Sequence, residues 1–478
     1  MTNTSLGITC VVLLAAAAVS GQEAPAGPDG TYSERYRPQF HYTVKKGWIN
    51  DPCGLVFHKG EYHLFNDHNP FGNKIPGPLG AKDRPPSRWS HAISTDLVHW
   101  KEMPIAILPD KLGAIFSGSG VVDRDNTAGF QKGDEQTLVL IYTSAGYPFK
   151  QSISYSTDRG RTWTAYAGNP VVPNQGLMRS ERDPMVFWHH PTKTWIMVLY
   201  VKRGVARFFT SGDLKKWTHA SDVTARGYHE CPDMFELPVN GDKDTMKWVL
   251  HGANFHYWIG RFDGKKFTAE SGPIQGDYGA NFYAAQTWRD AAGRRVQIAW
   301  MAGGKYPGMP FNQQQSFPCR LTLRKTPRGI RIVRYPVKEI GTLHGDTVVL
   351  KDKPLKPGTN PLAGVSGELL DIDMAVRVSQ ATEFSLRLHG DGVTYVGGKL
   401  VCFGRSAPLA PVDGTVKLRI LLDRTSIEVF GNDGEVSMTS CILPKNKVTP
   451  LALHAKGGPA HITSLTVRKL RSIWTSAG

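Results

Sequence analysis

Short apolar runs, each about the length of a β-strand, recur along the chain. Clear examples lie at residues 54–57, 62–65, 138–142 and 195–200. Gly, Asp, Asn or Lys residues that favour turns bound each run, which is typical of strands. The pattern therefore predicts an all-β protein.

A weak internal repeat organises these runs. Each copy has a short strand, then an Asp, then a Trp or Phe four or five residues further on. The Asp residues of the four copies are Asp96, Asp158, Asp213 and Asp263, which are separated by 62, 55 and 50 residues. A repeat of this length with about four strands is typical of a propeller blade. We expect the aromatic residues of the repeat, such as Trp100, Trp163 and Trp217, to pack between blades.

Five blades fit between residues 35 and 340. Their first strands begin near Asp51, Phe116, Asp183, Asp233 and Gln286. The sequence therefore predicts a five-bladed β-propeller, and the alternative is an irregular β-sandwich whose turns resemble one another by chance.

The pattern changes after about residue 340. Residues 351–358 are rich in Lys and Pro and are typical of a linker. Beyond them, apolar and polar positions alternate with period two, at 384–388, 416–420, 426–430 and 465–468, and Gly431-Asn432-Asp433-Gly434 is typical of a tight turn. We therefore predict a separate C-terminal β-sandwich at residues 350–476.

The first 21 residues have the features of a signal peptide. One apolar run covers residues 6–19, small residues stand at Ala18 and Ser20, and the chain is polar from Gln22 onward. The run is shorter than the roughly 20 residues that a membrane span needs. We expect a protein that is secreted or periplasmic after cleavage, with no membrane span.

Composition supports this fold and limits the partners. The chain of 478 residues has 50 Gly and 32 Pro, too many for a long-helix protein, and its 12 Trp, 16 Tyr and 20 Phe are too many for a disordered one. The net charge of +16 would attract polyanions if it were gathered on one face. The densest basic stretch, Arg320 to Lys338, interleaves Arg with apolar residues, which favours a half-solvated strand pair over a nucleic-acid patch. We expect no nucleic-acid partner.

Cysteine usage does not indicate a disulfide framework. Five cysteines remain after the predicted signal peptide, and none is spaced as a CxxC pair. We therefore expect no structural metal site. Cys53 and Cys231 both lie beside candidate catalytic residues, and whether they pair stays open.

Three carboxylates stand out near predicted blade starts. Asp51, Asp183 and Glu230 are each followed by Pro, directly or after one residue. Blade starts surround one central pocket, so these three acids should converge there. Glycosyl transfer needs two carboxyl groups, one ionised and one protonated, and a third can stabilise an oxocarbenium-like transition state. A single Asp-Pro is typical of an ordinary turn, so the hypothesis rests on the set.

Seven sequence blocks resemble glycoside hydrolase family 32, the β-fructofuranosidases that include invertases, inulinases and levanases. They lie at residues 48–54, 65–72, 89–100, 116–119, 182–184, 230–233 and 283–288, in the family's order and approximate spacing. The C-terminal stretch 423–430 is also similar to the family. The resemblance covers residues 35 to 475 and implies a five-bladed propeller with a C-terminal sandwich.

The resemblance also implies the roles of individual residues. Asp51 matches the family's nucleophile, Glu230 its general acid/base, and Asp183 its transition-state stabiliser, with Arg182 beside it. The positions that match the fructose pocket are Asn50, Phe116, Ser117, Tyr283 and Trp300. No metal or organic cofactor is implied. A retaining mechanism predicts that the carboxyl groups of Asp51 and Glu230 lie about 5 to 5.5 Å apart, and repulsion among the three acids is expected to raise the pKa of Glu230.

Four positions depart from the family pattern. The family usually has Asn at Cys53, Gln at Asp67, Trp at Ile75 and Gly at Ser90. Asp67 adds a fourth acid to the pocket, which would raise a neighbour's pKa or recruit a cation such as Lys74, Lys82 or Arg84. We expect Trp89 to fill the place of the missing aromatic wall.

We therefore predict an exported β-fructosidase acting on levan, inulin or sucrose. One alternative is a fructosyltransferase, which uses the same covalent intermediate but passes it to a sugar. The other is a fructan-binding protein without activity, against which the three intact acids argue.

Overall fold

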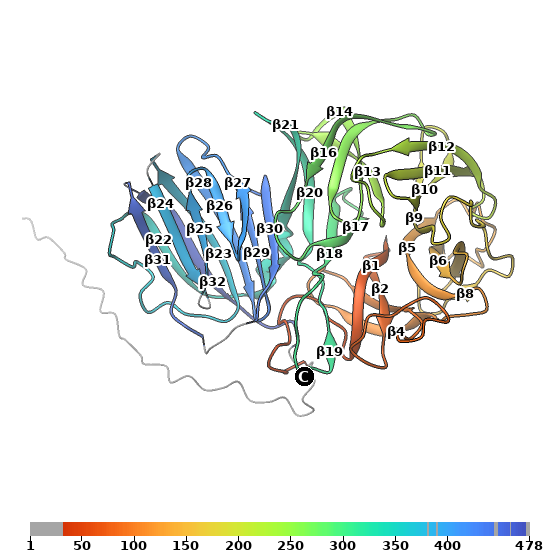
Figure 1. The fold of residues 1–478 in the computed structure, drawn as a ribbon, viewed down its shortest axis with the longest axis horizontal. Helices are drawn as coiled ribbons and strands as arrows, with labels where there is room; N and C mark the ends of the chain where they lie inside the picture. Colours follow the sequence, from red (N-terminus) through yellow and green to blue (C-terminus); the bar gives the residue numbers. More distant parts are fainter. Residues whose placement is uncertain (1–31, 380–381, 389–390, 444–447, 459, 475–478) are drawn as a thin grey trace, which may run out of the picture.

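The computed structural model describes residues 32–379, 382–388, 391–443, 448–458 and 460–474. Within them the regular secondary structure is almost entirely β-strand, with one short 3₁₀ helix at Lys338–Leu343, so the predicted all-β class is confirmed. Figure 1 shows two groups of strands: β1–β21 on one side and the C-terminal strands β22–β32 on the other. The expected signal peptide falls outside the described residues. In the described part, no helix is long and apolar enough to cross a membrane.

Strands β1–β21 form antiparallel units of about four strands each, which follow one another along the chain. The first has strands β1 (Gly47–His58), β2 (Glu61–Asn69), β3 (Arg88–Ser94) and β4 (Lys101–Ile107), with β19 (Phe311–Asn312) parallel to β1. The second has β5 (Ala114–Asp123), β6 (Thr137–Ala145), β7 (Lys150–Ser156) and β8 (Thr164–Ala165). The third has β9 (Arg182–His189), β10 (Thr194–Lys202), β11 (Val205–Ser211) and β12 (Thr218–Thr224).

The remaining strands of this group join into one larger sheet. Its first part has β13 (Asp233–Val239), β14 (Asp242–His251), β15 (His256–Phe262) and β16 (Phe267–Gln275). Its second part has β17 (Tyr283–Arg289), β18 (Arg295–Trp300), β20 (Cys319–Thr326) and β21 (Gly329–Pro336). A single parallel contact, Val239 opposite Leu323, joins the two parts through β13 and β20.

The first strands of the five units lie in a series, β13, β17, β1, β5 and β9, each against the next. Strand β5 contacts β1 and β9, and β17 contacts β1 and β13. These strands are buried on both faces, as expected for strands enclosed by neighbouring sheets, and strand β6, next to β5, is buried at every position. Residues that begin the first strands are thereby brought together although they are far apart in sequence.

The Asp residues of the sequence repeat have one structural role. The carboxylate of each Asp accepts hydrogen bonds from two backbone N–H groups that lie two to four residues further along the chain. These bonds close the turn between the third and fourth strands of a unit. The pairs are Asp96 with Val98 and His99, Asp158 with Arg161 and Thr162, Asp213 with Lys215 and Lys216, and Asp263 with Lys265 and Lys266. Trp100, Trp163 and Trp217 pack against buried clusters, as predicted.

The C-terminal strands form two sheets around one hydrophobic core. The six-stranded sheet has β22 (His344–Leu355), β32 (Ala460–Leu470), β23 (Leu370–Val378), β28 (Thr415–Asp423), β29 (Ser426–Gly431) and β30 (Val436–Cys441). The five-stranded sheet has β27 (Arg405–Pro408), β26 (Lys399–Cys402), β25 (Asp391–Val396), β24 (Thr382–Leu388) and β31 (Ala452–Gly457). The predicted tight turn joins β29 to β30, with Asn432 and Asp433 both at positive φ.

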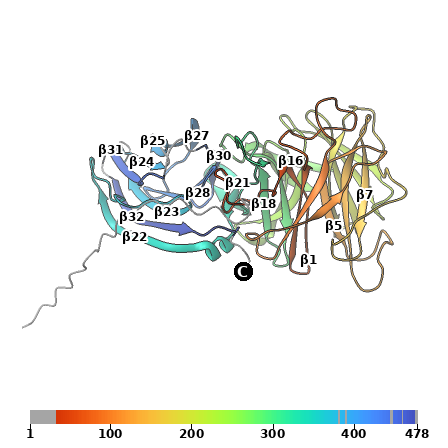
Figure 2. The ribbon, with the colours of Figure 1, turned by 90° about the horizontal axis from the view of Figure 1, so that it is seen from below.

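One expectation about the C-terminal strands is wrong, and one about the basic stretch 320–338 holds only in part. The stretch predicted as a linker from residue 351 is largely strand, because Lys351 to Leu355 complete β22 and pair with β32 along the edge of the sheet (Figure 2). The basic stretch is the predicted hairpin of β20 and β21, but Arg334 is not solvated. It is 1% exposed and forms ion pairs with Glu428 and Asp277.

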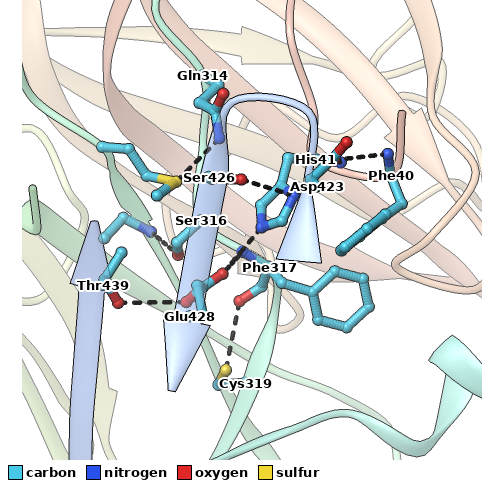
Figure 3. Close-up of polar contacts among 12 residues, drawn as sticks. Phe40, His41, Gln314, Ser316, Phe317, Cys319, Asp423, Ser426, Glu428 and Thr439 are labelled. Carbon is cyan, nitrogen blue, oxygen red and sulfur yellow. Dashed lines mark hydrogen bonds and ion pairs between the residues drawn. The ribbon is translucent and has the colours of Figure 1, made fainter. Parts of the chain in front are cut away.

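A buried polar cluster ties the two groups of strands together (Figure 3). Glu428 accepts hydrogen bonds from the backbone N–H of Phe317 at 2.6 Å, from the His41 ring at 3.0 Å and from Arg334 at 2.8 Å. Asp423 accepts from the other nitrogen of the His41 ring at 2.8 Å. Both ring nitrogens of His41 face carboxylates, so both must donate and the ring is an imidazolium.

This arrangement predicts a pH-dependent stability. Burial alone would lower the pKa of His41, but the hydrogen bonds from its ring to Asp423 and Glu428 outweigh burial and raise that pKa to about 9. The stabilisation is complete below the unfolded pKa of about 6.5 and is lost as pH rises through about 9. We expect the free energy of unfolding to fall between pH 6.5 and 9, and to fall less steeply in the variant His41→Gln. Urea unfolding across this range tests it, and equal slopes for both proteins would contradict the role of His41.

Candidate active site

A cavity of about 360 Å³ opens where the first strands of the units begin. Ten of the eleven residues predicted for the site line it: Asn50, Asp51, Asp67, Phe116, Ser117, Arg182, Asp183, Glu230, Tyr283 and Trp300. They come from strands β1, β2, β5, β9, β17 and β18 and from the segment before β13. The topology therefore gathers residues that are up to 250 positions apart in sequence.

Cys231 links two of the three predicted catalytic acids, Asp51 and Asp183, and follows the third, Glu230, in sequence. Its backbone N–H donates to Asp183 Oδ2 at 3.0 Å, and its thiol lies 3.3 Å from Asp51 Oδ2 and 3.5 Å from Asp183 Oδ2. Burial raises the pKa of this thiol well above its usual value, so it stays protonated and acts as a donor. Cys53 is also a free buried thiol, so Cys53 and Cys231 do not form a disulfide with each other.

Asp51 is held by donors on several sides. Ser117 Oγ lies 2.7 Å from Asp51 Oδ2, and the Asn50 amide donates to Asp51 Oδ1 at 3.3 Å. Burial raises the pKa of Asp51, while these hydrogen bonds act against the rise and the charge of Glu230 adds to it. The carboxylate is thereby fixed in orientation at the cavity wall.

Asp183 occupies a strained backbone position. Its φ is 64°, a left-handed conformation that Asp tolerates better than most residues and that is common at functional sites. Burial raises the pKa of Asp183 to about 7, with the charges of Glu230 and Asp51 adding to the rise and Arg182 opposing it.

Glu230 has the opposite environment to the one predicted. Arg182 forms a salt bridge with its carboxylate, donating from Nε at 3.0 Å and from Nη2, and the Tyr283 hydroxyl also donates to it. Burial acts to raise the pKa of Glu230, but Arg182 and Tyr283 outweigh burial, so the pKa lies below its usual value. The expected rise in the pKa of Glu230 is therefore not present.

One predicted pocket residue lies elsewhere. Trp89 is fully buried in a cluster with Cys53 and Phe65, behind the cavity wall, so it does not replace the missing aromatic wall. Its indole Nε1 instead donates to Asp67 Oδ1 at 3.1 Å. Asp67 forms no ion pair with Lys74, Lys82 or Arg84. Burial raises the pKa of Asp67 itself, and after burial the charge of Asp67 acts to raise the pKa of the neighbouring Cys53 thiol.

The rim contains Ile75 and Arg84, which the sequence analysis had named, and further residues that it missed. The segment after β2 also contributes Pro76, Pro78 and Ser87, and the segments before β7 and β9 contribute Tyr147, Phe149 and Ser180. Tyr147 is 55% exposed, and its ring packs against Phe149 at 4.7 Å between centroids. The signal that could have found them is the pair of aromatic residues around Pro148, directly after the predicted strand 138–142.

The donor set fits acid/base chemistry. In the described residues, no group of three or more His, Cys, Asp or Glu side chains is arranged to hold a metal ion. Four carboxyl groups in different environments, Arg182 and the Tyr283 hydroxyl line a single pocket, which defines the site of a glycoside hydrolase.

Comparison with known proteins agrees. The family model for the N-terminal domain of glycosyl hydrolases family 32 matches residues 41–336, and the model for its C-terminal domain matches residues 399–469. A levanase from Bacillus subtilis is 40% identical over 94% of this chain and 73% of its own length. An extracellular exo-inulinase from Aspergillus niger is 32% identical over 93% of this chain and 96% of its own length.

The fold has solved relatives as well. The crystal structure of exo-inulinase from Aspergillus awamori has a TM-score of 0.82 at 30% identity, covering 93% of this chain and 100% of that one. The structure of a fructofuranosidase from Schwanniomyces occidentalis in complex with fructose has the same TM-score at 27% identity, covering 92% of this chain and 99% of that one. The chain therefore belongs to glycosyl hydrolase family 32.

Proposed function

We propose that this enzyme releases β-fructofuranosyl units from levan, inulin or sucrose by a retaining mechanism with a covalent fructosyl-enzyme intermediate. The observation that carries the proposal is the single cavity in which Asp51, Asp183 and Glu230 converge. The levanase and exo-inulinase relatives support the substrate class.

In the proposed mechanism Asp51 attacks the anomeric carbon of fructose. Its orientation by Ser117 and Asn50 suits in-line attack, and Glu230 protonates the leaving oxygen. Asp183 accepts hydrogen bonds from fructose hydroxyls as positive charge develops on the ring. Glu230 then removes a proton from water, which releases fructose and restores Asp51.

In the proposed mechanism Arg182 couples substrate binding to the protonation of Glu230. Arg182 neutralises Glu230 and lowers its pKa. A fructose hydroxyl that draws Arg182 toward the sugar removes this attraction and leaves Glu230 buried beside other acids, so its pKa rises and it takes up a proton. Substrate binding thereby prepares the general acid.

The fold proposed for the catalytic domain is a five-bladed propeller at residues 35–340. The five four-stranded units support it, as do the contacts between their first strands. The two C-terminal sheets that share one core support a β-sandwich that starts at β22 rather than at residue 350, and its expected end at residue 476 lies outside the described residues. The extracellular exo-inulinase relative supports secretion of this enzyme.

Product analysis tests the proposal. Purified enzyme is incubated separately with sucrose, inulin and levan, and the products are identified over time. We expect free fructose from at least one of the three, and a loss of about 10²- to 10⁴-fold in kcat for Glu230→Gln, because general acid catalysis contributes that much. Fructose from none of them would contradict the proposal, and larger fructosylated products at high sucrose would indicate the fructosyltransferase instead.

A further inference from the structure

Asp67 is a buried carboxyl group without a cationic partner. It lies in strand β2, is 4% exposed and reaches the cavity wall. None of the ion pairs formed by the described residues includes it, and the nearest charges that act on it are the carboxylates of Asp51 and Asp183. An ionised carboxylate in such a place is costly, so it must be neutralised in another way.

The hydrogen bonds around Asp67 require one more proton than the neighbouring donors supply. Ser117 Oγ lies 2.7 Å from Asp51 Oδ2 and 3.1 Å from Asp67 Oδ2. A hydroxyl has one hydrogen and can donate it to one of these carboxyl groups. The second contact is a hydrogen bond only if the other carboxyl group carries a proton and donates it to Ser117 Oγ.

The remaining contacts of Asp67 fit a neutral acid. Its Oδ1 accepts from the Trp89 indole at 3.1 Å, as a carbonyl oxygen does. Its Oδ2 accepts from the Asn50 amide at 3.3 Å, and that amide uses its second hydrogen for Asp51 Oδ1 at 3.3 Å. Asp51 is half-buried and has an additional donor in the Cys231 thiol, so Asp51 is the better place for the negative charge.

We propose that Asp67 is a permanently protonated positioning residue, which donates its hydrogen to Ser117 and thereby directs the Ser117 hydrogen onto an ionised Asp51. This inference rests on the proposed function, since it concerns the nucleophile of that reaction. The pair Asp51–Asp67 then carries one negative charge, on the group that attacks the substrate. Fixing the hydroxyl hydrogen also fixes the orientation of the attacking oxygen.

The groups that face Asp67 from every packed strand agree with this assignment. Strand β1 presents Asn50, Asp51 and Cys53, β3 presents Trp89, β5 presents Ser117 and β9 presents Asp183. Burial raises the pKa of Asp67 well above its usual value, and the charges of Asp51 and Asp183 add to the rise. Burial also raises the pKa of the Cys53 thiol, so this neighbour is neutral too.

Two substitutions test, through their activity, whether Asp67 carries a proton. Asp67→Ala removes the donor to Ser117 and should lower kcat/KM about 100-fold, which is typical for loss of one preorganised donor. Asp67→Asn keeps a neutral group that can both donate and accept a hydrogen bond. Its kcat/KM should therefore be about tenfold higher than that of Asp67→Ala. The pH at which activity falls on the acid side of the profile should be the same for Asp67→Asn and the parent, because one neutral group replaces another. Equal losses for both variants, or an acid limb shifted to lower pH in Asp67→Asn, would overturn the proposal.

Stability tests the same proton without any substrate. A carboxyl group whose pKa is raised by folding destabilises the fold increasingly as pH rises above the unfolded pKa of about 4. The thermal midpoint of Asp67→Asn relative to the parent should therefore increase with pH. Asp213→Asn is the matched control, because backbone N–H donors outweigh burial and lower the pKa of Asp213, so its relative midpoint should stay nearly constant above about pH 5 and change only in more acid solution. A relative midpoint of Asp67→Asn that stays constant or decreases above about pH 5 would show an ionised Asp67, and this readout holds whether or not fructans are cleaved.

Discussion

Replacing Asp51 with Asn should lower kcat at least about 10⁴-fold, because an amide cannot form the covalent intermediate and removal of a nucleophile costs this much or more in other enzymes that use one. The substitution keeps the size of the side chain and leaves the amide of Asn50 and the Ser117 hydroxyl in place. Binding should be affected far less than turnover. The measurement is kcat on the preferred substrate, with the dissociation constant of the variant determined by calorimetry.

A matched control separates this effect from a general disturbance of the pocket. Ser144→Ala changes a buried hydroxyl that bonds only to Ser152 at 2.7 Å, in strands β6 and β7 away from the cavity. It should leave kcat close to that of the parent. If Asp51→Asn kept more than about a hundredth of the parent kcat, Asp51 would not be the nucleophile.

Replacing Arg334 with Met should destabilise the folded chain by about 3 to 5 kcal/mol, the usual cost of removing one partner of a buried ion pair. Arg334 is the cation between Glu428 and Asp277, and Met fills similar space without charge. The two buried carboxylates would then repel each other at the junction of β21 with β29 and β30. Urea or thermal unfolding measures the loss.

An exposed pair gives the comparison. Arg328 lies in the same hairpin as Arg334 and donates to Glu435 at 2.7 Å, but the Arg328 side chain is 41% exposed. Arg328→Met should cost about 1 kcal/mol or less, since water screens such a pair. Equal losses for Arg328→Met and Arg334→Met would show that the buried cluster does not stabilise the junction.

The sequence predicted those features that local chemistry determines. The repeated Asp residues marked turns because an Asp side chain closes them in any context, and period-two alternation marked the C-terminal strands. Asp51 and Asp183 are found together because each stands at the start of a first strand, where the topology brings chain segments into contact. The set of acids in the pocket followed from this pattern.

The features it missed depend on partners that are remote in sequence. Nothing near Arg334 indicates that Glu428 and Asp277 will enclose it. The same applies to Glu230, whose pKa is lowered by Arg182 of strand β9, and to Trp89, which is buried against Leu140 and Tyr142 of strand β6. The predicted linker became strand β22 because β32, more than 100 residues later, pairs with it.

The stereochemistry of transfer tests the central claim most directly. The enzyme is run on its preferred substrate in the presence of methanol, which competes with water for the fructosyl group at Asp51 and yields a product whose anomeric configuration does not change afterwards. Attack by Asp51 followed by a second displacement predicts methyl β-fructofuranoside, identified by NMR. Methyl α-fructofuranoside would show a single displacement and would contradict a covalent intermediate on Asp51.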